Sequence, residues 1–214
     1  MPGDPASEKY GQFSQGDILK AAIIGKEGRL GKVLVSILTG NGVEIDDDAD
    51  MAFLSVPIGS AMDYISRGDR IYVEVSSVKS VFRKYSGSIV SIHPLFGPSS
   101  YGDGVHRTVV FISDISNVKY KEIIEEMFRG YDVVSMTAED HDRMMVSDMI
   151  IPYLISMLVG KIEARYHTRS FDVVRDLASL VEGENPEVVM DTIRLNPYAG
   201  MAREMINDVM SVIP

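Results

Sequence analysis

Short apolar segments typical of buried β-strands recur through the first part of this 214-residue chain and stop before Thr137. Helical segments separate several of them, and such alternation predicts an α/β domain with a mainly parallel sheet. The sequence beyond Thr137 is typical of helices only. We therefore expect a loose arm over residues 1–17, an α/β domain over residues 18–136 and an all-helical domain over residues 137–214. The predicted strands are residues 20–24, 51–56, 70–75, 88–92, 108–112 and 132–136.

Three glycines, Gly25, Gly28 and Gly31, stand between the first predicted strand and the first predicted helix. Such a turn lets the backbone approach a phosphate and presents free N–H groups at the helix N-terminus. It is typical of a Rossmann-like dinucleotide-binding domain, although Lys26 stands where the familiar GxGxxG pattern needs its first glycine. An ordinary strand-to-helix turn could use the same glycines. The residues expected to contact the cofactor are Gly25, Lys26, Gly28, Arg29, Leu30, Gly31, Asp46, Val56 and Pro57.

The segment around Asp46 indicates that this domain is abbreviated. An acidic residue at the end of the second strand usually binds the ribose hydroxyls, and Asp46 falls at that distance. However, only residues 46–50 link residues 43–45 to the strand over residues 51–56. Five residues extend at most ~18 Å, whereas a parallel crossover takes about a dozen residues or more. We therefore expect that these segments are not both parallel strands of a complete sheet, and that a helix and a strand of the adenosine-binding half are missing.

The chain carries a net charge of −10 and has no cysteine. The excess of acidic over basic residues argues against nucleic acid and against an anionic membrane surface as partners, because phosphate contacts need clustered Lys and Arg. The absence of cysteine excludes disulfides, thiolate zinc sites and cysteine nucleophiles. Since His106, His141 and His167 also lack the spacing of metal ligands, we expect no metal site.

The sequence also predicts a cytoplasmic protein. No apolar run reaches the ~18 residues that a membrane span requires. The N-terminus lacks the basic region and apolar core of a secretory signal. The absence of cysteine fits a reducing compartment.

Polar motifs follow two of the strands and open the helical part. They are Ser76-Ser77-Val78-Lys79, His93-Pro94-Leu95-Phe96-Gly97-Pro98, Ala138-Glu139-Asp140-His141-Asp142-Arg143 and Asn185-Pro186. In this order and at these intervals, the series resembles the prephenate dehydrogenase family over roughly residues 20–197. The segment that begins at His93 is its most specific part.

The resemblance implies oxidative decarboxylation of prephenate to 4-hydroxyphenylpyruvate in tyrosine biosynthesis, with NAD as the hydride acceptor. NAD is preferred to NADP because Asp46 and the two aspartates after it would repel the extra phosphate. His93 matches the family's catalytic histidine, which takes the proton of the ring hydroxyl, and an imidazole suits that task. Ser77 matches a serine that hydrogen-bonds near this histidine, and Lys79 accompanies it as a substrate-binding residue.

Prephenate carries two carboxylates, so the site should contain an Arg or Lys that makes charge-assisted contacts. Arg165 is the first choice, and Arg169 lies in the same segment, although each could instead be a surface charge. Tyr153 stands where the family commonly places a substrate-contacting histidine. His141 belongs either to the site or to the polar cap of a helix N-terminus.

The resemblance also implies a homodimer formed through the helical domain, for which Met205 and Val209 offer an apolar face. The other expected partner is the small-molecule substrate, with neither nucleic acid nor membrane. Two alternatives remain. The chain could be an arogenate dehydrogenase, or it could be a non-catalytic homologue that has lost dinucleotide binding and senses an aromatic metabolite.

Overall fold

The computed structural model describes residues 19–97 and 100–213, so the predicted arm over residues 1–17 lies outside the described residues. Its strands are β1 (Lys20–Ile24), β2 (Glu44–Ile45), β3 (Met51–Leu54), β4 (Ile71–Glu74), β5 (Val90–Pro94), β6 (Thr108–Ile112) and β7 (Asp132–Met136). They form one sheet in the order β2-β1-β3-β4-β5-β6-β7. Neighbours are parallel except β5 and β6, which are antiparallel. The predicted Rossmann-like, mainly parallel sheet is confirmed.

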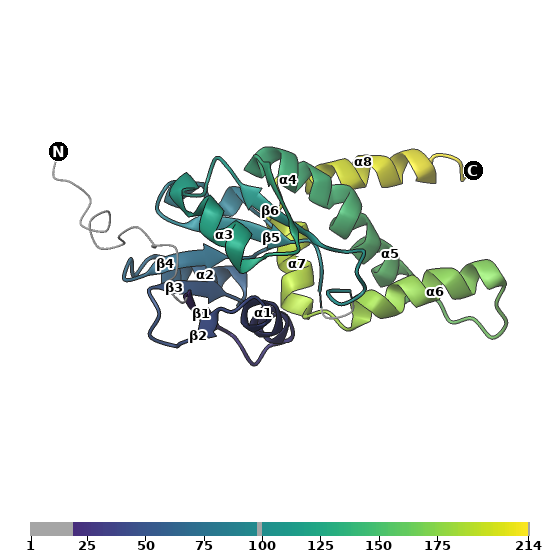
Figure 1. The fold of residues 1–214 in the computed structure, drawn as a ribbon. Helices are drawn as coiled ribbons and strands as arrows, with labels where there is room; N and C mark the ends of the chain where they lie inside the picture. The colour runs from purple at the N-terminus through teal and green to yellow at the C-terminus, as the bar shows by residue number, and fades with distance from the viewer. Residues whose placement is uncertain (1–18, 98–99, 214) are drawn as a thin grey trace.

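Helices cover both faces of this sheet (Figure 1). Phe53 and Phe111 belong to a core that includes α1 (Arg29–Gly40) and α3 (Lys121–Met127), whereas their neighbours Leu54 and Ile112 belong to a second core with α2 (Ile58–Ile65). Because successive strand residues point to opposite faces, both faces need apolar side chains. This explains why the strands are continuous apolar runs. Short 3₁₀ helices η1 (Ser80–Tyr85) and η2 (Val118–Tyr120) complete the α/β part.

Beyond β7 the described residues form helices only. The π-helix η3 (Val146–Ile150) packs against α8 (Ala199–Met210) around Val146, Ile150 and Ala202. The helix α6 (Arg169–Glu182) runs back along α5 (Ile151–Val159). Figure 1 shows α8 and the α5–α6 hairpin projecting from the same end of the molecule. No described helix is both long and apolar enough to cross a membrane. The elements are α4 (Ala138–Met145), η3 (Val146–Ile150), α5 (Ile151–Val159), α6 (Arg169–Glu182), α7 (Pro186–Leu195) and α8 (Ala199–Met210).

The connection between β2 and β3 differs from the sequence-based expectation. Residues 43–45 and 51–56 were expected not to be both parallel strands of a complete sheet, yet β2 and β3 both pair parallel with β1, on opposite sides of it. The length rule behind that expectation does not apply here, because β2 is only two residues long: Ile45 pairs with Ala21, and β3 pairs from Ala22 onward. The link therefore crosses β1 without running back along a strand. Since β2 is the edge of the sheet, no described strand lies beyond it, which agrees with an abbreviated adenosine-binding half.

Two glycines allow close backbone approach in the turn between β1 and α1. Gly25 has a φ of +88°, and a Cβ there would lie 2.2 Å from the carbonyl oxygen of Ser55. A Cβ on Gly31 would lie 2.1 Å from the carbonyl oxygen of Gly25. Both distances are far below van der Waals contact, so only glycine fits at these positions. They fix the start of α1 beside the end of β3.

Gly31→Ala should therefore lower the free energy of unfolding by roughly 2 kcal/mol, because the added methyl group overlaps backbone that cannot move aside. Gly40→Ala, at the other end of α1, is the matched control. No atom lies within 4 Å of its Cβ, and alanine favours a helix over glycine by up to about 1 kcal/mol. Urea unfolding followed by circular dichroism measures both. A wild-type midpoint for Gly31→Ala would contradict the close approach.

Candidate active site

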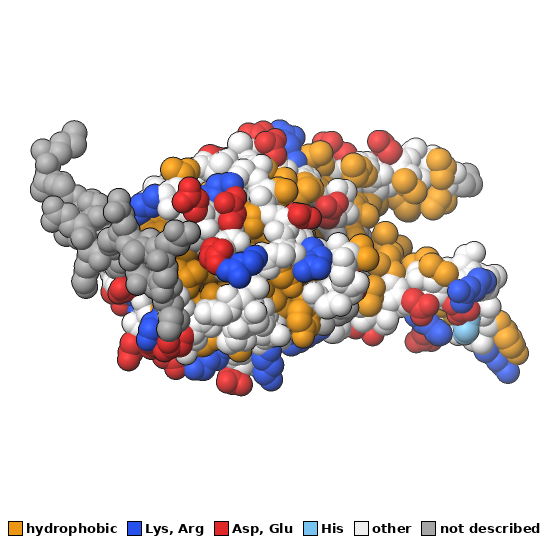
Figure 2. Space-filling view, in the orientation of Figure 1, with side chains coloured by type: hydrophobic (Ala, Val, Ile, Leu, Met, Phe, Trp, Pro, Cys, Tyr) orange, Lys and Arg blue, Asp and Glu red, His pale blue; other side chains and the backbone are white. Residues whose placement is uncertain are grey.

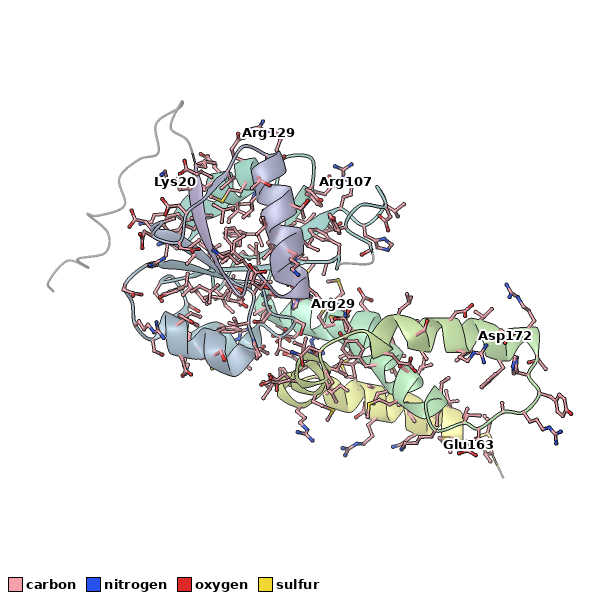
Figure 3. The ribbon with its side chains drawn as sticks, turned by 90° about the horizontal axis from the view of Figure 1, so that it is seen from below. Lys20, Arg29, Arg107, Arg129, Glu163 and Asp172 are labelled. Carbon is pink, nitrogen blue, oxygen red and sulfur yellow. The ribbon has the colours of Figure 1, made fainter. Side chains whose placement is uncertain are left out.

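A cavity of about 1030 Å³ lies where the carboxyl ends of β1, β3, β4 and β5 meet the helical part. Parallel sheets bind ligands at this edge. Arg29 lies at the same junction (Figure 3), and a Cβ on Gly183 would be 3.2 Å from its guanidinium. Arg29 therefore reaches from the glycine turn to the turn before α7. The cavity is lined by residues 28–30, 55–58, 75–77, 93–97, 100, 105, 106, 108, 145, 148, 149, 153, 183–185, 188 and 191.

The N-terminus of α1 forms part of the cavity wall. Gly28 is its N-cap and supplies no side-chain hydrogen bond, and the first turn contains no acidic residue. The backbone N–H groups of residues 29–31 have no acceptor among the described residues. Such open N–H groups attract phosphate. Ser76 adds a buried Oγ without a hydrogen-bond partner in the same cavity wall, so the residues present fit a dinucleotide.

His93 is the last residue but one of β5, with its ring in the cavity wall and its Nδ1 against a second histidine. His93 Nδ1 lies 2.9 Å from His141 Nε2, and His141 Nδ1 lies 2.9 Å from Asp142 Oδ1. Burial, with repulsion from His141 and Lys79, holds the pKa of His93 well below its ordinary value. His93 is therefore neutral near pH 7, the form that accepts a proton.

His141 and Asp142 are fully buried on α4, and neither caps that helix. Thr137 is the N-cap, since its side chain accepts a hydrogen bond from the backbone N–H of Asp140. Of the two roles expected for His141, the capping role is therefore wrong. Although burial favours the neutral acid, hydrogen bonds from His141, Ser80 and the Lys79 backbone hold the pKa of Asp142 below its usual value.

Lys79 lies behind His93 rather than in the cavity. Its side chain is completely buried, with Nζ 2.7 Å from Glu74 Oε1 and 2.6 Å from the carbonyl oxygen of Ile92. Ser91 donates a further hydrogen bond to the same Glu74 oxygen. A buried ammonium needs such a partner, because leaving it unpaired would cost several kcal/mol. The predicted contact between Lys79 and substrate is therefore absent from this arrangement, and Lys79 instead supports the strand that carries His93.

Ser77 lines the cavity and hydrogen-bonds across to the helical part. Its Oγ lies 2.5 Å from Thr192 Oγ1 on α7, and Thr192 donates to the carbonyl oxygen of Val188. The Thr192 hydroxyl has one proton, and the bond to Val188 takes it. Ser77 is therefore the donor in its bond to Thr192, and its own oxygen keeps lone pairs for a ligand. Sequence reasoning missed Thr192. It lies 115 residues from Ser77, and a threonine within a helix gives no signal of such a contact.

Tyr153 lies in the cavity wall, whereas the two arginines do not. Burial, with a nearby Glu184, raises the pKa of the Tyr153 phenol, so it stays a neutral hydrogen-bonding group. Arg165 and Arg169 are exposed near the far end of the α5–α6 hairpin, where Glu163 and Asp172 are marked in Figure 3. The described chain does not bring them to the cavity, and their role in binding carboxylates stays a prediction.

The predicted cofactor ligands fall into three groups. Gly28, Arg29, Leu30, Val56 and Pro57 line the cavity, while Gly25 and Gly31 shape the turn behind it.

Lys26 and Asp46 lie outside the cavity lining. The Lys26 ammonium pairs with Asp47 at 2.7 Å. Asp46 directly follows β2, accepts a hydrogen bond from the Asp48 backbone and pairs with Lys20 at 3.2 Å. These bonds lower its pKa, so the carboxylate stays charged. No group of three or more His, Cys, Asp or Glu side chains among the described residues is placed to hold a metal ion.

Comparisons with known proteins agree on the fold. No family model matches the sequence. The T-protein of Enterobacter agglomerans is 24% identical over 169 residues, which cover 67% of this chain and 45% of that protein, so the match spans less than half of the relative.

Two solved structures are similar over most of their length. The prephenate dehydrogenase of Aquifex aeolicus in complex with hydroxyphenyl propionate and NAD+ has a TM-score of 0.71 at 14% identity, covering 94% of this chain and 91% of that chain. The arogenate dehydrogenase of Synechocystis has a TM-score of 0.62 at 16% identity, covering 91% and 92%. The chain therefore has the fold of prephenate and arogenate dehydrogenases.

The buried neutral histidines should make the fold sensitive to mild acid. Burial is the main cause that places the pKa of both His93 and His141 below 6.5, so the unfolded chain binds protons first as the pH falls. Their contribution to stability is complete above pH 6.5 and is lost below it. Between about pH 7.5 and about pH 5.5, the wild type should lose roughly 1 kcal/mol more unfolding free energy than His93→Asn. Equal losses in urea titrations would contradict a buried neutral His93.

Proposed function

We propose that this chain is an NAD-dependent dehydrogenase that oxidises prephenate to 4-hydroxyphenylpyruvate. The observation that carries the proposal is one cavity that combines an open helix N-terminus with a buried, neutral His93. The first feature suits a dinucleotide phosphate, and the second suits a general base. The fold shared with the Aquifex and Synechocystis enzymes supports the same assignment.

In this proposal His93 takes the proton of the substrate's ring hydroxyl. Its Nδ1 faces His141, so Nε2 is the nitrogen left to receive that proton. Ser77 lies in the same wall, and its lone pairs can accept a hydrogen bond from another donor of the bound ligands. NAD, when bound, supplies the hydride acceptor, while loss of carbon dioxide makes the ring aromatic. The apolar side chains of Val56, Pro57 and Leu95 in the cavity lining would limit the access of water to the reacting carbon.

The glycine turn would hold the cofactor. The N–H groups at the start of α1, together with Arg29, would bind the pyrophosphate, and the orphaned Ser76 hydroxyl would bond a polar group of the ligand. Asp46 follows the end of β2 and remains charged, which favours the ribose hydroxyls of NAD over the phosphate of NADP.

Arogenate is a second candidate substrate because the cavity lining is acidic. Asp148, Glu184 and Asp191 line it, whereas Arg29 is the sole Lys or Arg among the described lining residues. Prephenate brings two carboxylates, and arogenate brings an ammonium group as well. The acidic lining suits that ammonium better than it suits an additional anion.

Turnover of the two substrates tests the function. Formation of NADH is measured with prephenate and with arogenate, for wild type, His93→Asn and the surface control His167→Gln. The wild type and His167→Gln should turn over one substrate, and His93→Asn should lose roughly 10²–10⁴-fold in kcat, the range that a general base contributes. Undiminished turnover by His93→Asn would contradict the mechanism. Binding of prephenate without any turnover would favour a non-catalytic, metabolite-binding protein.

We also propose a homodimer through the helical part. Figure 2 shows hydrophobic side chains along both projecting arms, on the sides that face each other. The exposed apolar residues of these helices include Leu158 on α5, Leu180 on α6 and Val209 on α8, which are 63%, 62% and 68% exposed. Apolar side chains gathered in this way usually mark an interface.

Val209→Glu should shift this dimer toward monomer, because it places a charge in the apolar contact. Asn207→Glu adds the same charge to the same helix at an exposed polar position and is the control. Sedimentation velocity over a range of protein concentrations measures both. A wild-type protein that is monomeric throughout would contradict the proposed dimer.

A further inference from the structure

A line of three side chains runs from the cavity into the protein interior. His93 is 8% exposed, and His141 and Asp142 are fully buried. The two imidazole rings meet edge to face, with centroids 5.0 Å apart and planes at 69°. Both junctions in the line are 2.9 Å long, from His93 Nδ1 to His141 Nε2 and from His141 Nδ1 to Asp142 Oδ1. Each side chain is therefore within hydrogen-bonding distance of the next.

The position of each proton follows from the Asp142 end of this line. Asp142 Oδ1 accepts the Lys79 backbone N–H, and Oδ2 accepts the Ser80 backbone N–H, each at 2.8 Å. A carboxylate in such a setting only accepts, so the proton between it and His141 belongs to His141 Nδ1. If His141 is neutral, its Nε2 is bare and must accept from His93 Nδ1–H. The remaining nitrogen, His93 Nε2, then has a free lone pair.

We propose that Asp142 and His141 form a relay that fixes His93 as the Nδ1–H tautomer, leaves its Nε2 as the proton acceptor in the cavity, and shares the positive charge when a proton arrives. The tautomer follows from these hydrogen bonds together with a neutral His141, whose pKa burial lowers. Only the source of the arriving proton, the substrate hydroxyl, rests on the proposed function. His141 and Asp142 are thus positioning residues, and His93 is the group that meets the substrate.

The proton balance of the relay is simple. One proton binds His93 Nε2, and the Nδ1 proton of His93 moves to His141 Nε2. His141 then carries two protons, and the cation lies next to Asp142. The charges around the two rings favour this placement. Lys79 repels a cation on either ring, whereas Asp142 and Glu74 attract one on His141. When product leaves, the proton on His141 Nε2 returns to His93 Nδ1, and His93 Nε2 releases its proton to the product or to solvent.

The tautomer can be measured without any substrate. The chain has four histidines, so a protein labelled with ¹⁵N-histidine and carrying no histidine tag gives a simple spectrum, which His167→Gln, His106→Gln and His93→Asn assign. Near neutral pH, His93 should show a protonated Nδ1 and an unprotonated Nε2, and so should His141. A protonated Nε2 on His93, or an imidazolium at either residue, would overturn the relay.

Two substitutions at His141 separate tautomer control from proton sharing. His141→Gln keeps a carbonyl oxygen that accepts from His93 Nδ1–H but takes up no proton, so the tautomer should persist. His141→Phe removes the acceptor, so the tautomer should be lost. Both should lower kcat by roughly 10²-fold with little change in KM, within the range that general-base catalysis contributes. His167→Gln is the control for both readouts.

The spectrum and the kinetics give independent outcomes. Wild-type kcat in both His141 variants, or an unchanged His93 tautomer in His141→Phe, would overturn the relay. If neither variant folds, the spectrum of the wild type still decides the tautomer. If the wild type turns over neither prephenate nor arogenate, the proposed function fails, while the spectrum tests the hydrogen-bonded line by itself.

Discussion

The buried carboxylate of Asp142 joins three separate parts of the chain. It accepts the backbone N–H groups of Lys79 and Ser80, which follow β4, and it bonds His141 on its own helix. The backbone carbonyl of Asp142 accepts a hydrogen bond from Asn196, at the end of α7. Because a buried carboxylate is costly unless its oxygens are satisfied, these partners are held in fixed positions. The cavity lies between the parts of the chain that this residue joins.

The abbreviated edge of the sheet leaves the proposed phosphate site intact. The glycine turn is supported by β1 and β3, because Gly25 packs against the Ser55 backbone and Gly31 packs against Gly25. Neither contact involves a strand beyond β2. The loss of sheet therefore affects the region that would hold adenosine and not the start of α1. Two ends of one cavity can thus serve different tasks, with phosphate binding at α1 and proton transfer at His93.

The sequence predicts the local features well and the long-range ones poorly. The strands can be predicted because helices cover both faces of the sheet, so the strands are apolar. The turn at Gly25 and Gly31 can be predicted because steric overlap excludes other residues there. The contact between Ser77 and Thr192 joins residues far apart in the chain, so no local pattern reveals it. The position of Lys79 behind β5 was not predicted for another reason. A lysine after a strand is ordinarily solvated, and only its ion pair with Glu74 explains its burial. The parallel pairing of both β2 and β3 with β1 was not predicted, because a length rule for ordinary strands was applied to a strand of two residues.

The central claim is that this chain, with its shortened sheet, binds NAD at the N-terminus of α1. Calorimetric titration with NAD, with and without prephenate, tests it most directly. Arg29→Glu places an anion in the cavity wall, while Lys32→Glu makes the same charge reversal on α1 at an exposed residue outside the cavity lining. Our account predicts saturable binding by the wild type and by Lys32→Glu, and loss of binding in Arg29→Glu. No binding of NAD by the wild type, with or without prephenate, would contradict it.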